Sequence, residues 1–373
     1  MNQKTIFLIG IALLLLHSCN PDSEGDEFPD VNGEMTHQKI LTLDTHVDTP
    51  YSWFSVEGFD FAGNDESLGF NNNVDLDKMK RGGLDAIFLV AYIDQGPLDQ
   101  AGFAFAIDTT KKLIDKLLDV VADCNDMARL GRTFQDAYDN EKDSLATIYL
   151  AIENGHAIGD SLPILQEYYD KGVRYITLCV LHSNAICASS TDPDATEDNG
   201  LSDFGRMVVK EMNRLGIMID ISHVSDKSFF DVLSITKTPV IASHSGIRSL
   251  LNHPRNLSDS MLEALAMNGG VIQVCFVGPY LVPSPPATVS DLVDHIDYVV
   301  DLVGIDHVGI GSDFDGGGGL WDCRNASQIE NITNELINRG YSWEDIQKIW
   351  GGNLLRVFRQ VALYADGQKG ESK

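Results

Sequence analysis

Basic residues are scarce in this sequence of 373 residues. Lysine and arginine together number 27, against 55 aspartates and glutamates, which gives a formal net charge of −28. Nucleic-acid binding depends on a positive surface that neutralises phosphates, so this balance argues against a nucleic-acid partner. Anionic lipid headgroups would repel the folded body for the same reason. Hydrophobic residues still make up 43% of the chain, enough for the core of a globular protein.

Cysteine is also rare, and no two of the six cysteines have CxxC spacing. Cys19 belongs to an N-terminal segment that is considered separately. The other five are Cys124, Cys179, Cys187, Cys275 and Cys323. An odd number without paired spacing argues against a disulfide framework and against a cysteine zinc site. We expect these residues to be buried as small hydrophobic side chains.

Long apolar runs are lacking as well, because the longest run, residues 6–16, is too short to span a bilayer. It follows Lys4 and ends in Leu-His-Ser-Cys at 16–19, which resembles the lipobox of bacterial lipoproteins. We expect residues 1–19 to be a lipoprotein signal peptide with Cys19 lipidated, and residues 20–36 to be a flexible tether. An ordinary signal peptide cut nearby is the alternative.

The lipobox-like segment places the protein in the bacterial cell envelope. Its only link to the membrane would be the lipid on Cys19. The expected location is the outer membrane, with the periplasmic and surface faces both left open.

Internal repeats are absent, but short apolar runs alternate with helical patterns along the rest of the chain. The expected strands are residues 40–46, 86–92, 147–153, 173–181, 216–222, 239–243, 270–276 and 307–311. The expected helices are 111–129, 162–171, 203–215, 226–235, 259–267, 290–303 and, outside the barrel, 343–363. Ser225 and Ser258 precede two of them as N-caps. The pattern predicts an α/β fold, a (β/α)8 TIM-like barrel with C-terminal helices over residues 37–365, followed by a polar tail at 366–373.

Polar residues end several of the expected strands, and parallel barrels carry their chemistry at that end. These residues are His46 and Asp48, Glu153, His223, His244, Asp313 and Asp315. A lone histidine at a strand end is commonly a hydrogen-bonding residue, and an isolated Glu153 could cap a helix. Together, however, three imidazoles and two carboxylates suit zinc. We expect Glu153 to lie between two ions, one completed by His46 and Asp48 and the other by His223 and His244.

Ten stretches, in order along the chain, resemble the membrane (renal-type) dipeptidase family. They are LDTHVD (43–48), VDLDKMKRGGLDAIF (74–88), IENGHAIGD (152–160), GVRYITL (172–178), LGIMIDISHVSD (215–226), PVIASHS (239–245), RNLSD (255–259), GGVIQVCF (269–276), GIGSDFDG (309–316) and GGNLLRVF (351–358). The similarity spans about residues 37–364. Such a number of separate motifs makes a chance match untenable.

The resemblance implies a dinuclear zinc dipeptidase, with two Zn²⁺ ions bridged by Glu153 and a metal-bridging hydroxide that attacks the amide bond of a dipeptide. The family's metal ligands correspond to the same five residues. Arg255 matches the residue that holds the substrate's terminal carboxylate, and its guanidinium fork suits that group. Asp313 matches the proton carrier, although a ligand or structural role is the alternative. Asp315 is expected to be structural, and a homodimer is possible.

Two positions depart from the family pattern. Val180 stands where the family has a histidine that contacts substrate, and His182, two residues on, either replaces it or lies out of reach. Val277 stands where some relatives carry a tyrosine that touches the substrate carboxylate, with Tyr280 nearby. The change at Val180 keeps open a metal-dependent amidohydrolase acting on another small amide or lactone. A lipoprotein that binds peptides without cleaving them is a further alternative.

Overall fold

The computed structural model describes residues 35–50, 59–63 and 72–371. The expected signal peptide, Cys19 and the tether up to residue 34 lie outside the described residues. Residues 36–373 form one compact unit, which contains all the described secondary structure. Within the described ranges, no helix is long and apolar enough to cross a bilayer.

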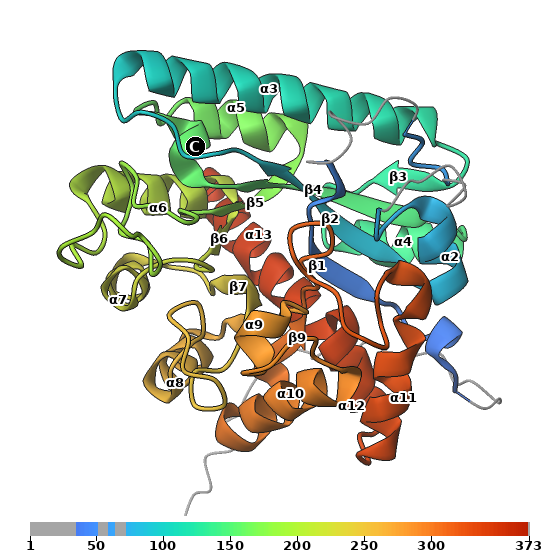
Figure 1. The fold of residues 1–373 in the computed structure, drawn as a ribbon. Coiled ribbons are helices and arrows are strands. Elements are labelled where there is room, and N and C mark those ends of the chain that lie inside the picture. The colour runs from blue at the N-terminus through green and yellow to red at the C-terminus, as the bar shows by residue number, and fades with distance from the viewer. Residues whose placement is uncertain (1–34, 51–58, 64–71, 372–373) are drawn as a thin grey trace, which may run out of the picture. The chain divides into compact units, whose positions relative to one another are not determined.

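Eight parallel strands form a nearly closed barrel (Figure 1). In the order in which they pair, they are β1 (Leu43–Val47), β2 (Ala86–Tyr92), β4 (Ala146–Glu153), β5 (Val173–Thr177), β6 (Met218–Asp220), β7 (Ile241–Ser245), β8 (Val271–Val274) and β9 (Val308–Ile310). Beyond β9, the backbone N–H of Asp313 donates to the carbonyl of His46 at 3.0 Å, which links the last strand's loop to the first strand. The predicted (β/α)8 barrel is confirmed.

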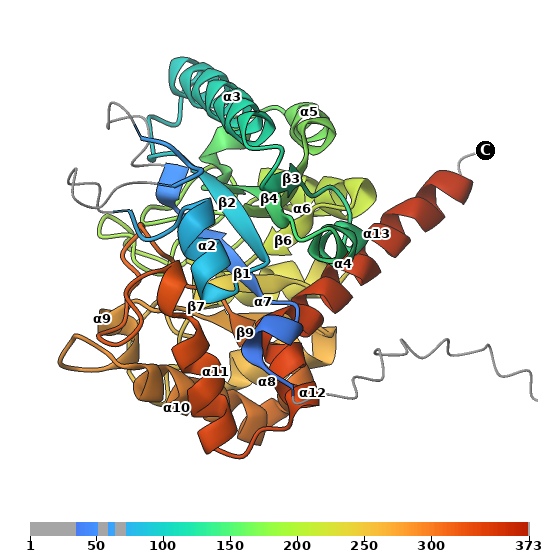
Figure 2. The same cartoon turned by 90° about the vertical axis from the view of Figure 1, so that its right-hand side faces the viewer.

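Helices connect the strands and surround the barrel (Figures 1 and 2). They are α2 (Leu76–Gly82), α3 (Gln100–Asp123), α4 (Gln135–Lys142), α5 (Ile164–Lys171), α6 (Asp203–Leu215), α7 (Asp226–Ile235), α8 (Asp259–Asn268), α9 (Gly278–Leu281), α10 (Val289–Val303), α11 (Glu330–Asn338), α12 (Trp343–Gln347) and α13 (Asn353–Glu371). The predicted N-caps are confirmed: the hydroxyl of Ser225 accepts from the Ser228 N–H, and that of Ser258 from the Met261 N–H.

Several expected elements have different bounds. The helix expected at 343–363 is divided into α12 and α13, and α13 continues to Glu371, into the expected polar tail. The helix expected at 111–129 begins earlier, at Gln100, because Asp99 caps it by accepting from the Gly102 N–H. It also ends at Asp123, and a short strand, β3 (Ala128–Leu130), follows it and pairs with β4. The strand expected at 173–181 stops at Thr177, so Val180 and Leu181 lie in the following loop.

Alternate residues along the strands fill the interior of the barrel with aromatic and aliphatic side chains. Phe88 stacks on Tyr149 with ring centroids 4.8 Å apart, and Phe88 also contacts Tyr175. The C-terminal segment, expected outside the barrel, joins this core through α13, where Phe358 packs edge-on against Tyr149. Because the strand residues of this core include the first residues of β1, β2, β7 and β8, α13 covers the amino-terminal end of the barrel. The carboxyl-terminal end is left for the site.

The five cysteines within the described part of the chain are all free and buried, as expected. None of them lines the cavity at the carboxyl-terminal end of the barrel.

Candidate active site

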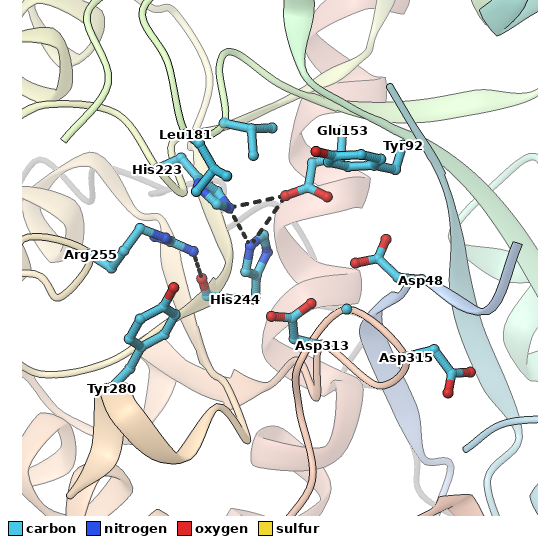
Figure 3. A pocket seen from close by; sticks show the side chains of 12 residues that line it. Asp48, Tyr92, Glu153, Leu181, His223, His244, Arg255, Tyr280, Asp313 and Asp315 are labelled. Atoms are coloured by element: carbon cyan, nitrogen blue, oxygen red, sulfur yellow. Dashed lines mark hydrogen bonds and ion pairs between the residues drawn. The ribbon is translucent and has the colours of Figure 1, made fainter. Parts of the chain in front are cut away.

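The expected ligands converge at the carboxyl-terminal end of the barrel, where His46 and His244 come from β1 and β7 and Glu153 ends β4. Figure 3 shows four of them, Asp48, Glu153, His223 and His244. Asp48 follows β1, and His223 lies three residues beyond the end of β6. All five residues are buried, with at most 7% of their surface exposed.

Glu153 lies between two groups of donor atoms. Its Oε1 is 3.0 Å from His223 Nε2 and 3.5 Å from His244 Nε2, and these two nitrogens are 2.8 Å apart. Its Oε2 is 3.5 Å from His46 Nε2, which is in turn 3.6 Å from Asp48 Oδ2. The two carboxylate oxygens therefore face two different sets of ligands.

Backbone strain is concentrated in the loops of this site. Among the described residues other than glycine, five have positive φ, and the four near the site are Asn154 (83°), His223 (69°), Asp313 (61°) and Asp315 (68°). Side chains with a Cβ adopt this conformation at a cost, and such residues cluster at functional sites. The packing around the barrel end thus holds His223 and Asp313 in orientations that a relaxed loop would not favour.

The electrostatics of the site are those of a cation-binding cavity. Burial lowers the pKa of His223 to about 4, helped by the charge of Arg255, and burial also lowers the pKa of His244 well below its usual value. Both imidazoles are therefore neutral, the form that binds metal. Burial and the neighbouring Asp48 raise the pKa of Asp313 well above the usual range. These acidic groups repel one another, and a bound cation would relieve that repulsion.

Hydrogen bonds fix the ring orientation of His46. The hydroxyl of Tyr175 donates to the carbonyl of Thr45 at 3.0 Å, so at 2.8 Å from His46 Nδ1 it accepts the imidazole proton. This turns Nε2 into the site. Burial opposes a charge there, but the neighbouring Asp48 and Glu153 raise the pKa of His46 well above its usual value, and a bound cation would take the place of that proton. His46 Nε2 and Asp48 Oδ1 are both buried without a hydrogen-bond partner. Unpaired buried donors and acceptors are costly, and metal ligation would satisfy both.

A cavity of about 280 Å³ opens over these ligands (Figure 3). Besides Asp48, Glu153, His223 and His244, its wall includes Arg255, Tyr280, Asp313, Val180 and Leu181. Nη2 of the buried Arg255 donates to the carbonyl of His244 at 3.0 Å, and its guanidinium lies 5.5 Å from the centre of the Tyr280 ring. Within the described part of the chain, no carboxylate pairs with this arginine. Its charge is free to receive an anionic substrate group.

The chain matches the family model for membrane dipeptidase (peptidase family M19) over residues 33–372. The chain belongs to the membrane dipeptidase family. It is 34% identical to dipeptidase tcpJ of Claviceps purpurea, over 80% of this chain and 71% of that protein. It is 35% identical to dipeptidase verJ of Clonostachys rogersoniana, over 86% of this chain and 84% of that one.

Among solved structures, that of the probable dipeptidase PvdM of Pseudomonas aeruginosa is similar, with 28% sequence identity and a TM-score of 0.78. The match covers 88% of this chain and 97% of PvdM. The fold of that structure therefore extends over the whole barrel of this chain.

The two positions at which this dipeptidase family member departs from the family pattern are Val180 and Val277, and only Val180 lines the cavity. Val180 and Leu181 line it, whereas His182 does not. The imidazole of His182 lies 3.4 Å from Asp192 on the outer part of the same loop. A role for His182 in substrate binding therefore has no support in the geometry. Tyr280 does line the cavity, whereas Val277 caps the short helix α9.

Several site residues of this dipeptidase family member gave no recognisable signal in the sequence. Tyr175 lies within an apolar strand, and Ser243 within β7. Gly316 is a third: a Cβ there would lie 2.0 Å from Asp48 Oδ2 and 2.4 Å from Asp313 Oδ1. Only a glycine allows these two carboxylates to lie so close to the loop. Asp315, also on this loop, accepts from the Thr49 hydroxyl and the Asn73 N–H, a structural arrangement.

Proposed function

We propose that this chain is a dinuclear zinc dipeptidase that hydrolyses the single amide bond of a dipeptide. One observation carries the proposal: each oxygen of the Glu153 carboxylate faces a separate set of ligand atoms, as a carboxylate that bridges two metal ions must. Membership of a dipeptidase family supports the choice of substrate.

Under this proposal, one ion is held by His46, Asp48 and Glu153, and the other by Glu153, His223 and His244. Imidazole nitrogens and carboxylate oxygens are the donors that zinc prefers in catalytic sites. A pair of zinc ions bound there supplies polarisation of the amide carbonyl and lowers the pKa of the attacking water.

Asp313 is the proposed proton carrier. Its carboxyl lines the cavity beside Asp48, and a carboxylate in this position can take up a proton and return it during the reaction. The attacking water gives a proton to Asp313 as its oxygen bonds to the carbonyl carbon. Asp313 then passes this proton to the amide nitrogen as the C–N bond breaks. The products are two free amino acids.

Arg255 is the proposed binding group for the terminal carboxylate of the dipeptide. It is 2% exposed, lines the cavity and has an unpaired Nε. In a chain with a net charge of −28, a carboxylate needs a local cation of this kind to bind. A carboxylate accepts two parallel hydrogen bonds from a guanidinium, which would set the distance from the substrate terminus to the scissile bond.

One observation favours a second candidate, a metal-dependent amidohydrolase that acts on another small amide or lactone. Val180 and Leu181 give the cavity an apolar wall at the place where the family resemblance leads one to expect a histidine. The donor that this histidine would offer to substrate is missing. A panel of dipeptides, N-acyl amino acids and lactones separates the two candidates by their relative kcat/KM.

The deciding experiment measures zinc content and dipeptide hydrolysis on the full chain, purified in detergent, before and after chelation. We expect about two zinc ions per chain, with turnover lost on chelation and restored by zinc. Two bound zinc ions without turnover of any dipeptide would mean that the metal site is present but the substrate is not a dipeptide. A protein that binds no zinc would refute the proposal.

The lipid anchor at Cys19 is a separate proposal, which rests on the lipobox-like end of the apolar run. We expect the wild-type chain in bacterial membranes to carry a diacylated Cys19 detectable by mass spectrometry. A Cys19→Ala variant should be released from the membrane fraction. Equal membrane retention of both forms would contradict the anchor.

A further inference from the structure

A buried carboxylate outside the ligand set lies directly beneath it. Asp220 ends β6, and none of its surface is exposed. Oδ1 accepts from the backbone N–H groups of Ser222 at 3.0 Å and Ser243 at 2.9 Å. Oδ2 accepts from the hydroxyls of Thr177 and Ser243, each at 2.6 Å. All four partners donate, so the group is an ionised carboxylate, and the two short bonds are charge-assisted.

The Ser243 hydroxyl connects this carboxylate to a proposed zinc ligand. Its single proton goes to Asp220, so its lone pairs accept. His244 Nδ1 lies 2.8 Å from the same oxygen and therefore donates its proton to it. His244 is thereby fixed with its proton on Nδ1, and its Nε2 lone pair points at Glu153 and His223.

We propose that Asp220 and Ser243 are positioning residues for zinc binding, joined in a chain from carboxylate to hydroxyl to imidazole to metal. A hydroxyl that donates to an ionised carboxylate becomes a better acceptor, which strengthens its hold on the imidazole. Outer partners of this kind orient metal-binding histidines and raise their basicity. This inference rests on the proposed function, because it assigns the two residues to a zinc ion held by His244.

The three histidines differ in this support, which makes the proposal specific. His46 Nδ1 has the Tyr175 hydroxyl at 2.8 Å, and Ser243 only at 3.3 Å. His223 Nδ1 is buried without a hydrogen-bond partner. Loss of the Asp220–Ser243 pair should therefore lower the affinity for the ion at His223 and His244. The affinity for the ion at His46 and Asp48 should change little.

A purely structural role is the competing explanation, since Asp220 also joins three neighbouring strands. Thr177 on β5 offers a matched control. Its hydroxyl donates to the same Oδ2 at the same 2.6 Å as Ser243 does, but in the structure it bonds to no imidazole. Thr177→Val removes one bond from Asp220 at nearly constant volume, as Ser243→Ala does, without breaking the chain to His244.

The experiment titrates the metal-free full chain with zinc in competition with a chromogenic chelator. It compares wild type, Ser243→Ala, Asp220→Asn and Thr177→Val, and follows the thermal unfolding of each metal-free protein. We expect Ser243→Ala and Asp220→Asn to lower the affinity for one of the two zinc ions by ten- to a hundredfold. Thr177→Val should change both affinities by less than threefold, although it lowers the unfolding temperature about as much as Ser243→Ala.

Unchanged zinc affinities in Ser243→Ala, or an equal loss in Thr177→Val, would overturn the positioning role. If Asp220→Asn does not fold, the comparison of Ser243→Ala with Thr177→Val still decides. Wild type separates this inference from the function on which it rests. If wild type binds two zinc ions and all variants have the same zinc affinities, the inference is wrong but the proposed function stands. If wild type binds no zinc, the proposed function is wrong.

Discussion

At the scale of single residues, Gly316 controls how closely two acidic side chains approach the loop after β9. An added Cβ would lie 2.0 Å from Asp48 Oδ2, far inside van der Waals contact, so Asp48 and Asp313 must shift in a Gly316→Ala variant. Displacement of a reacting group by about 1 Å can cost about a hundredfold in rate. We expect kcat/KM to fall by about that factor, as measured in a dipeptide hydrolysis assay.

The exposed helical Gly367 supplies the control, because a Cβ there has no neighbour within 4 Å. Gly367→Ala should keep wild-type activity. Full activity in Gly316→Ala would mean that the reaction does not depend on the positions of Asp48 and Asp313, and would contradict the roles proposed for them.

Arg255 is predicted to recognise the free carboxylate of the substrate. Arg255→Ala should raise KM for a dipeptide by on the order of a hundredfold, as expected for a lost charged hydrogen bond. The corresponding dipeptide amide lacks that carboxylate, so its KM should change only a few-fold. Arg81, an exposed arginine paired with Asp77 on α2, is the control and should tolerate alanine. Equal effects on both substrates would contradict the assignment.

Asp313 is predicted to move protons, and the alternative is that it binds metal. Asp313→Asn keeps the shape of the side chain but cannot take the proton, so kcat should fall by about 10²–10⁴-fold while zinc content stays at two. Asp315→Asn on the same loop should have a far smaller effect, since its carboxylate is turned towards Thr49 and Asn73. Loss of one zinc from Asp313→Asn would identify it as a ligand.

The site residues that end the strands could be predicted from the sequence. The residues that hydrogen-bond those ligands and orient them could not. His46, Glu153 and His244 stand out because each is polar where an apolar strand ends. Tyr175 and Ser243 lie inside strands, and their roles depend on atoms such as His46 Nδ1, 129 positions away from Tyr175 in the chain. No local pattern encodes such a contact. His182 was close in sequence to the expected substrate contact, but it does not line the cavity and lies 3.4 Å from Asp192 instead.

At the scale of elements, a chain of hydrogen bonds ties the first described segment to the C-terminal helices. Trp350 Nε1 donates to the hydroxyl of Thr333 at 2.7 Å, and that hydroxyl lies 2.7 Å from His37 Nδ1. His37 Nε2 lies 2.9 Å from the Gly82 carbonyl and must donate to it. His37 is therefore neutral in the fold, and burial lowers its pKa.

This predicts a loss of stability in acid. The unfolded chain binds a proton on His37 at its ordinary pKa and the folded chain does not, so stability falls as pH drops below about 6.5. Thermal unfolding at pH 7.5 and 5.5 should show a smaller decrease for His37→Gln than for wild type. His307→Gln should behave as wild type does, because the His307 ring bonds the Gly270 carbonyl near the surface rather than a buried network of this kind. The same decrease in all three would exclude His37 as the cause.

Most elements could be predicted because their signals are local. All eight expected barrel strands exist, although β5 is shorter than expected, and the helices α6 and α7 match their expected ranges, since apolar periodicity and serine caps mark them. The three-residue β3 is too short to show any period, and its pairing with β4 is a tertiary contact. The early start of α3 depends on Asp99, a cap that lies well before the apolar stripe on which the prediction rested.

At the scale of the whole molecule, closure of the barrel follows from the number of strands, but the role of the last helix does not. Eight alternating strands and helices close a sheet almost regardless of detail. Which side of the barrel α13 covers depends on how Phe358 meets Tyr149, a contact that amphipathic spacing alone does not specify. Charge, by contrast, is a property of the whole chain that can be read directly from composition.

The net charge of −28 predicts how substrates reach the site. A negative field repels an anionic dipeptide and attracts a cationic one, over a Debye length of about 30 Å at 0.01 M salt and less than about 10 Å at 0.3 M. Between these concentrations, kcat/KM relative to Ala-Gln should rise severalfold for Ala-Glu and fall for Ala-Lys. Because the field acts on the approach of substrate, kcat at saturation should change little. Identical salt dependence for the three dipeptides would mean that Arg255 and the bound metal ions outweigh the charge of the whole chain at the mouth of the cavity.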